Sequence, residues 1–134
     1  MAYGGGTYED ITLPAAADLS SYQYHFVTVD ANGRGTITTA ATTPVIGILQ
    51  NKPSAAEAPA RIRVSGISKL AAGAALNEAE RVCSTPQDAT SLDGHGFGTV
   101  AAATSIGVFI GAIVLAACGA SADITDLLVT RYQI

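Results

Sequence analysis

The sequence TPVIGILQNKPSAAEAPARIRVSGISKL, Thr43 to Leu70, carries two different strand signals. The first is the unbroken apolar run at 45–49, whose lack of alternation predicts a strand that is covered on both sides. The second is Arg61 to Ser65, where polar and apolar residues alternate strictly, which is typical of a strand with one wet face and one dry face. A loop with two prolines separates the two signals. Together they predict a small β-domain with one core and one exposed face that carries arginines.

The composition indicates a chain that other subunits cover. At 134 residues the chain is expected to form one domain, large enough to fold without disulfides or metals. Hydrophobic residues make up 49% of it and charged residues only 13%, about half the usual share. Because charge keeps soluble proteins apart, so few charges suit a surface that is hidden in an assembly. The alternative is a weakly charged β-domain of small residues that needs no partner.

The charge balance and the cysteines narrow the classes of protein further. The net charge is −4, from seven basic and eleven acidic residues, which argues against a dedicated nucleic-acid binder because phosphate contacts need clustered cations. Cys83 and Cys118 stand at no metal-ligand spacing, and two thiols without a framework fit a protein made in a reducing cytoplasm. Whether the two are paired stays open. The first residues carry no secretory signal pattern.

No group of residues predicts catalysis. His25 and His95 are the only histidines, and neither has the ligand spacing of a metal site. Gly94 to Gly98 lacks the lysine of a phosphate loop, and Ser65 lacks the glycine pattern of a nucleophile elbow. We therefore expect no enzyme activity, no cofactor and no bound metal.

Further strands are expected on both sides of the central stretch. Ile11–Pro14 predicts a short edge strand that ends at proline. Tyr22–Asp30 is rich in aromatic and β-branched residues and predicts a strand, whose broken alternation indicates a bulge or burial of both faces. Asn32-Gly33 predicts a hairpin turn that leads into a second strand at Thr36–Thr39. Asp126–Ile134 predicts a closing strand.

The segment from Phe97 to Ala122 has no charged residue. Its apolar centre, Ile106–Cys118, has to be weighed as a membrane helix, but it is short, rich in β-branched residues and interrupted by glycine. A pair of buried strands bent at Gly111 is the interpretation we favour. Lys69–Ala75 is composed of small residues and is expected to be flexible.

Met1–Asp10 is expected to be a flexible arm. Three consecutive glycines make this stretch costly to order, while Tyr3 and Tyr8 offer flat rings with a hydroxyl that suit an interface. A frayed terminus is the alternative.

Three basic residues lie on or beside one predicted strand: Arg61, Arg63 and Lys69. They could form a docking stripe for an acidic partner surface. The simpler interpretation is the solvated face of an amphipathic strand, because exposed charges contribute little on their own.

Five features follow one another along the chain: the apolar-glycine run Pro44–Leu49, the loop rich in proline and alanine, the strand Ala60–Gly66, the segment Ser68–Ala75, and Thr104–Val108 ahead of the final strands. In this order they resemble the small capsid decoration (cement) proteins of tailed bacteriophages. The resemblance implies a compact β-rich subunit, often trimeric, that binds the outside of the head and holds neighbouring major capsid subunits together. It implies no catalytic residue. The long uncharged region departs from the more charged proteins expected in that family.

The sequence thus predicts a mainly β chain: residues 11–134 as a single small domain, β-barrel or β-sandwich-like with long loops, and residues 1–10 as the arm. We expect a structural protein of the virion, on the capsid surface, with the major capsid protein as partner and a homotrimer as its own assembly. Neither nucleic acid nor membrane is expected as a partner. The alternatives are a subunit of a self-assembling fibre or tube and a small membrane-associated protein.

Overall fold

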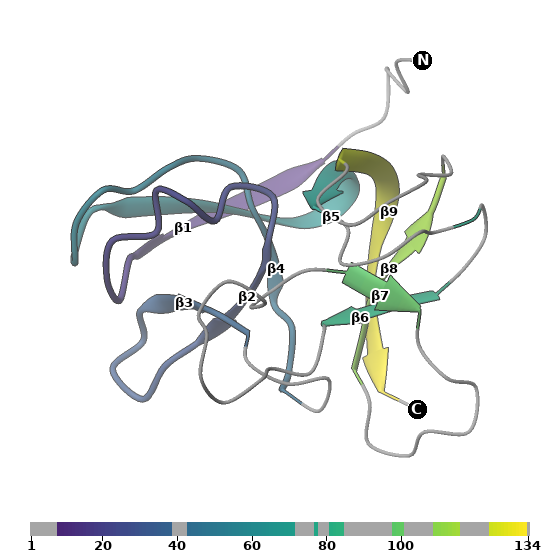
Figure 1. Cartoon of the computed structure of the whole chain (residues 1–134). Helices are drawn as coiled ribbons and strands as arrows, with labels where there is room; N and C mark the ends of the chain where they lie inside the picture. The colour runs from purple at the N-terminus through teal and green to yellow at the C-terminus, as the bar shows by residue number, and fades with distance from the viewer. Residues whose placement is uncertain are drawn as a thin grey trace.

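The computed structural model describes residues 8–38, 43–71, 77, 81–84, 98–100, 109–115 and 124–133. These residues form nine strands and no helix, which confirms the mainly β prediction (Figure 1). The strands are β1 (Glu9–Pro14), β2 (Phe26–Val29), β3 (Gly35–Ile37), β4 (Gly47–Leu49), β5 (Pro59–Ala71), β6 (Arg81–Ser84), β7 (Gly98–Val100), β8 (Phe109–Val114) and β9 (Ile124–Gln133).

Strand β5 is shared by two sheets and organises the fold. Its first half pairs antiparallel with β1 and β4, and its second half pairs with β9 from Gly66 onward. Gly66 has a φ of 93°, a conformation that glycine adopts without steric cost, at the point where the strand passes from one sheet to the other. The predicted alternation at Arg61–Ser65 is confirmed. The flexible segment expected at Lys69–Ala75 is wrong for its first three residues, because the strand continues through Ala71, and residues 72–75 lie outside the described part of the chain.

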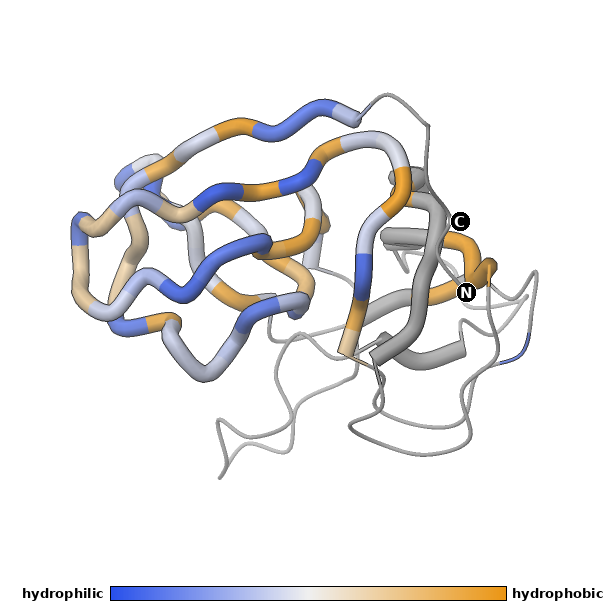
Figure 2. The backbone as a smooth tube through the Cα atoms, turned by 90° about the horizontal axis from the view of Figure 1, so that it is seen from above, coloured by the Kyte–Doolittle hydropathy of each residue, from blue (hydrophilic) through white to orange (hydrophobic). Residues whose placement is uncertain are grey.

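The first half of the chain closes into a small barrel. Strands β1, β5, β4, β2 and β3 pair antiparallel in that order. Ala15, directly after β1, then bridges to Gly35 of β3, and the Ala16 N–H donates to the Gly35 carbonyl at 2.9 Å. Hydrophilic and hydrophobic residues alternate along β1 and the first half of β5 (Figure 2), as expected when one face of a strand lines a core. The buried residues of that core are Ala15, Leu19, Val27, Ile37, Leu49, Ala60 and Ile62.

The second half of the chain adds an antiparallel sheet against the barrel. Its strand order is β5-β9-β8-β6-β7 (Figure 1, right). The closing strand predicted near the end of the chain is confirmed as β9. The bend predicted at Gly111 coincides with a register shift between Ile110 and Ala112, a bulge in the pairing of β8 with β9. Across Gly111 the structure describes one strand, β8, with the bulge inside it, while residues 106–108 and 116–118 of the expected pair of strands lie outside the described residues.

A second core joins the barrel to this sheet. The side chains of Phe26 and Ile48 project from the outer side of the barrel and pack with buried residues of the other sheet, which are Leu70, Val82, Val114 and Val129. All three residues of β4 are buried, with Ile48 in this core and Leu49 inside the barrel. The prediction of a strand covered on both sides is therefore confirmed. Barrel and sheet together form a layered β-fold of the kind expected from the sequence.

Two predictions near the first hairpin have different outcomes. The strand expected over Tyr22–Asp30 is shorter, because Tyr24 has a φ of 66° in a turn and the strand begins only at Phe26. In that turn the Tyr24 N–H donates to the Leu49 carbonyl at 2.7 Å and its carbonyl accepts from the Ala71 N–H at 2.9 Å, so the residue ties the barrel to the second sheet. The hairpin turn is confirmed, with Gly33 at a φ of 77°.

Several sequence predictions fall on residues beyond those that the structure describes. They concern Tyr3 and the rest of 1–7, His95 and Cys118. Cys83 lies in β6 and pairs with Thr99 of β7. Among the described residues, none belongs to a helix that is long and apolar enough to cross a membrane.

Candidate partner-binding surface

An ion pair between β1 and β5 is the most buried of the ion pairs among the described residues. Asp10 stands opposite Arg63 in the strand register, so their side chains share the outer face of the ladder. Arg63 Nε donates to Asp10 Oδ1 at 2.9 Å, one terminal nitrogen lies 3.3 Å from Oδ2, and the other donates to the Ile67 carbonyl at 3.0 Å. Both side chains are only 15% exposed. The pair therefore fastens the first strand to β5 just before its bend.

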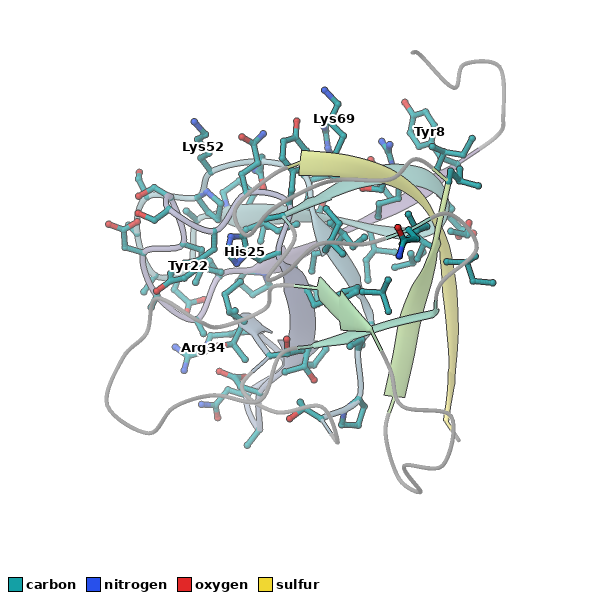
Figure 3. All side chains as sticks on the ribbon, turned by 45° about the vertical axis from the view of Figure 1, so that its right-hand side comes forward. Tyr8, Tyr22, His25, Arg34, Lys52 and Lys69 are labelled. Atoms are coloured by element: carbon teal, nitrogen blue, oxygen red, sulfur yellow. The ribbon has the colours of Figure 1, made fainter. Side chains whose placement is uncertain are left out.

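Tyr8 covers this ion pair. The ring centroid lies 3.9 Å from the central guanidinium carbon of Arg63, within the range of a cation–π contact. The residue nevertheless stays 61% exposed and projects from the molecule (Figure 3). A large ring that is held in place yet open to solvent is the kind of group that contributes strongly to interfaces.

Arg61 shares the same carboxylate from the other side. Its Nε lies 3.4 Å from Asp10 Oδ2, and its side chain is 55% exposed. It stands opposite Thr12 on the outer face. We call the surface formed by Tyr8, Asp10, Thr12, Arg61 and Arg63 the β1–β5 face.

The lysines extend this surface unevenly. Lys69 is exposed on the second half of β5, opposite Asp126 in the register, and so lies beyond the bend from Arg61. Lys52 is also exposed, and it projects from the same side of the molecule as Lys69 and Tyr8 (Figure 3). Its neighbour Asn51 pins the loop to β5, since the Arg61 N–H donates to Asn51 Oδ1 at 2.9 Å.

The structure thus brings together three of the five residues predicted for an interface. Tyr8, Arg61 and Arg63 meet on the β1–β5 face, Lys69 lies further along β5, and Tyr3 is outside the described residues. Sequence reasoning missed Lys52, whose only signal is a lysine followed by proline in the loop that precedes β5. It also missed Asp10, because no alternation pattern reveals which acid stands across from Arg63.

A second group of charges lies at the first hairpin and has a structural role. Arg34 contacts Asp30 at 3.1 Å and Glu57 at 3.3 Å. The Arg34 backbone N–H, which donates to the Asp30 carboxylate, is the main cause that lowers the pKa of Asp30. Glu57 and then Asp30 raise the pKa of Arg34. These contacts hold the hairpin against the loop that precedes β5, so the three charged side chains are already paired with one another.

Residues with possible chemistry are not gathered elsewhere in the described part of the chain. No three side chains of His, Cys, Asp or Glu come together there in a way that could hold a metal ion. His25 is buried and meets the ring of Tyr22 edge-on, with the centroids 5.3 Å apart.

The fold is similar to a structural component of a virus. The crystal structure of the N base of head fiber gp8.5 in bacteriophage phi29 matches with a TM-score of 0.58 and covers 96% of this chain and 98% of that one. The sequence identity is 10%, so the likeness shows a shared fold. No family model and no curated protein matches the sequence.

Proposed function

We propose that this chain is a structural protein of a bacteriophage virion that attaches to the outside of the head and stabilises the contacts between major capsid subunits. The observation that carries the proposal is the fold, shared over nearly the whole of both chains with the base of a phage head fiber. A match of this extent supports a similar kind of part, a β-domain whose surface serves attachment.

Two features of the sequence support the same role. Charged residues are only 13% of the chain, which suits a subunit whose surface is covered in an assembly. The order of sequence features from Pro44 to Val108, which includes most of β5, resembles that of capsid decoration proteins and supports a place on the outside of the head. Attachment at many equivalent positions gives avidity without strong single contacts, and raises the cost of pulling subunits apart.

We further propose a homotrimer, with the N-terminal residues as part of the attachment. The ion pair of Asp10 and Arg63 holds the last residue of the predicted arm in β1, and we propose that the preceding residues of that arm contact a neighbouring subunit. Tyr3 would supply a ring contact there, as Tyr8 does on the β1–β5 face.

Attachment is tested by mixing the purified chain with emptied heads of the phage that encodes it and separating heads from free protein by sedimentation. We expect the chain to sediment with the heads and to raise the temperature at which they break. A variant that lacks residues 1–7 is expected to bind less while its unfolding midpoint is unchanged. Absence of co-sedimentation by the full chain would contradict the proposed function, and light scattering tests the trimer as three times the 13.5 kDa of one chain.

A further inference from the structure

We infer that the β1–β5 face binds a carboxylate of an acidic partner protein segment, and that Arg61 is the residue that takes it. The inference deepens the proposed function, since it names the chemistry of the partner at the attachment surface. Its test below uses neither heads nor other virion parts, so the two proposals can fail separately.

Arg61 has hydrogen-bond donors that no acceptor among the described residues engages. Only its Nε approaches Asp10, at 3.4 Å, which is longer than a good charge-assisted hydrogen bond. Within the described part of the chain, no hydrogen bond or ion pair uses its two terminal nitrogens, and more than half of the side chain is exposed. The terminal nitrogens of a guanidinium form a planar fork that matches the two oxygens of a carboxylate.

Asp10 cannot neutralise this fork. The carboxylate is engaged by Arg63, whose Nε lies at 2.9 Å and whose terminal nitrogen lies at 3.3 Å. One negative charge therefore stands between two guanidiniums, and the outer one keeps an unmatched positive charge. A carboxylate from a partner would pair with the outer guanidinium, so that positive and negative groups alternate along the surface.

The surroundings of Arg61 are already ordered. Tyr8 is stacked on Arg63, and the backbone of Arg61 is fixed on both edges, by β1 on one side and by the amide of Asn51 on the other. A partner that binds here orders few new groups, which lowers the entropic cost of association. The exposed ring of Tyr8 and the exposed ammonium of Lys52 provide apolar and charged contacts beside the fork.

The same residues favour a protein over a nucleic acid. Asp10 lies between the guanidiniums of Arg61 and Arg63, so a phosphate backbone with a charge on every nucleotide would meet a carboxylate here. A single carboxylate on a protein loop can reach Arg61 without that repulsion. The face is therefore suited to local recognition of an acidic side chain.

The test is an NMR titration of the chain at low salt with a blocked peptide in which one glutamate is flanked by glycines, so that the probe carries a single carboxylate. We expect shifts of the backbone amides of Tyr8, Thr12 and Arg61 and of the Arg61 Nε–H. Arg61→Gln is expected to weaken binding about fivefold, the size of an exposed ion pair. Arg61→Lys keeps the charge but loses the fork, and is expected to weaken binding about two- to threefold because an ammonium cannot bind bidentately.

Arg34→Gln is the matched control, because it removes the same charge from the chain at the other charged group. It is expected to change the affinity for the single-glutamate peptide by less than about twofold, the limit set by general screening. Binding by Arg61→Gln that equals the wild type, or shifts centred away from the β1–β5 face, would overturn the inference. Tighter binding of a 12-base-pair DNA duplex than of the single-glutamate peptide would also overturn it.

Discussion

Replacement of Asp10 by asparagine isolates the contribution of the ion pair that holds β1. The substitution keeps the size and one carbonyl oxygen of the side chain, and it removes the charge and one of the two acceptor atoms for Arg63. Arg63 then stays in place, still bonded to the Ile67 carbonyl, with its guanidinium largely covered. The change therefore tests how much the pairing of these two charges stabilises the fold.

The magnitude follows from the burial of both partners. A hydrogen bond to a charged group contributes about 1.5–3 kcal/mol. Loss of one partner of a fully buried pair costs about 3–5 kcal/mol. Because Asp10 and Arg63 are each 15% exposed, water partly screens the pair, and asparagine retains one bond. We expect Asp10→Asn to lower the free energy of unfolding by about 2 kcal/mol, a large fraction of the 5–15 kcal/mol typical of a domain.

The assay is urea denaturation of both Asp10→Asn and Glu57→Gln, which is the matched control. Glu57 contacts Arg34 at 3.3 Å, but its side chain is 65% exposed, so the same chemical change is expected to cost no more than about 0.5 kcal/mol. Equal losses for the two variants would refute the reasoning, because they would mean that the burial of the Asp10–Arg63 pair adds nothing. The slope of the transition must stay constant for the comparison to hold.

Two further outcomes follow from the structure. Gly47→Ala is expected to lower the free energy of unfolding by about 3 kcal/mol or more, because the new methyl group would overlap the carbonyl oxygen of Arg63 and lie 2.7 Å from Ile62 Cγ2. Gly35→Ala places a methyl group 3.3 Å from the end of a side chain, so it is expected to cost about 1 kcal/mol in the same urea assay. Stability should also fall in acid, because the Ser20 hydroxyl lowers the pKa of Asp18 and the Arg34 backbone amide lowers the pKa of Asp30. The contribution of these two carboxylates to the free energy of unfolding is complete above the ordinary pKa of about 3.9 and is lost as the pH falls through their lower pKa values in the folded chain. NMR titration of both carboxylates checks this, with Ser20→Ala expected to return Asp18 toward its ordinary pKa, and midpoints at or above that value would contradict it.

The sequence predicted the parts of the fold that depend on local patterns. Apolar runs and alternation indicated β4, β5 and β9, because burial on two faces or on one face leaves a direct trace in residue order. The turn at Asn32-Gly33 was predictable for a similar reason, since only a few residue pairs tolerate its backbone angles. The position of Gly111 indicated the irregularity in β8.

Other parts of the fold depend on contacts between distant segments and left no local signal. Nothing in the aromatic stretch before Phe26 shows that Tyr24 turns with a positive φ, because the reason is its pair of hydrogen bonds with Leu49 and Ala71. The continuation of β5 through small residues to Ala71 depends in the same way on β9, which is more than fifty residues away. Tertiary pairing overrides composition at both places.

The candidate surface likewise has a part that local sequence pattern predicted and a part that depends on contacts between distant segments. Alternation placed Arg61 and Arg63 on one face and suggested an even stripe of exposed charge. The structure makes them unequal, because Asp10 and Tyr8 cover Arg63 and leave the fork of Arg61 open. Which arginine is occupied depends on the register of β1, and the sequence does not specify a register between strands fifty residues apart.

These ion pairs strengthen the argument from composition. Among the basic side chains that the structure describes, Arg34, Arg61 and Arg63 each contact an acid of the same chain. Charges that neutralise one another contribute little to the repulsion that keeps molecules apart in solution. Among the side chains that the structure describes, these pairs therefore leave fewer isolated charges than the composition indicates, with Lys52 and Lys69 outside any ion pair. Of the three arginines whose side chains are described, Arg61 keeps an open fork, and this is the group on which the proposed binding of an acidic partner segment depends.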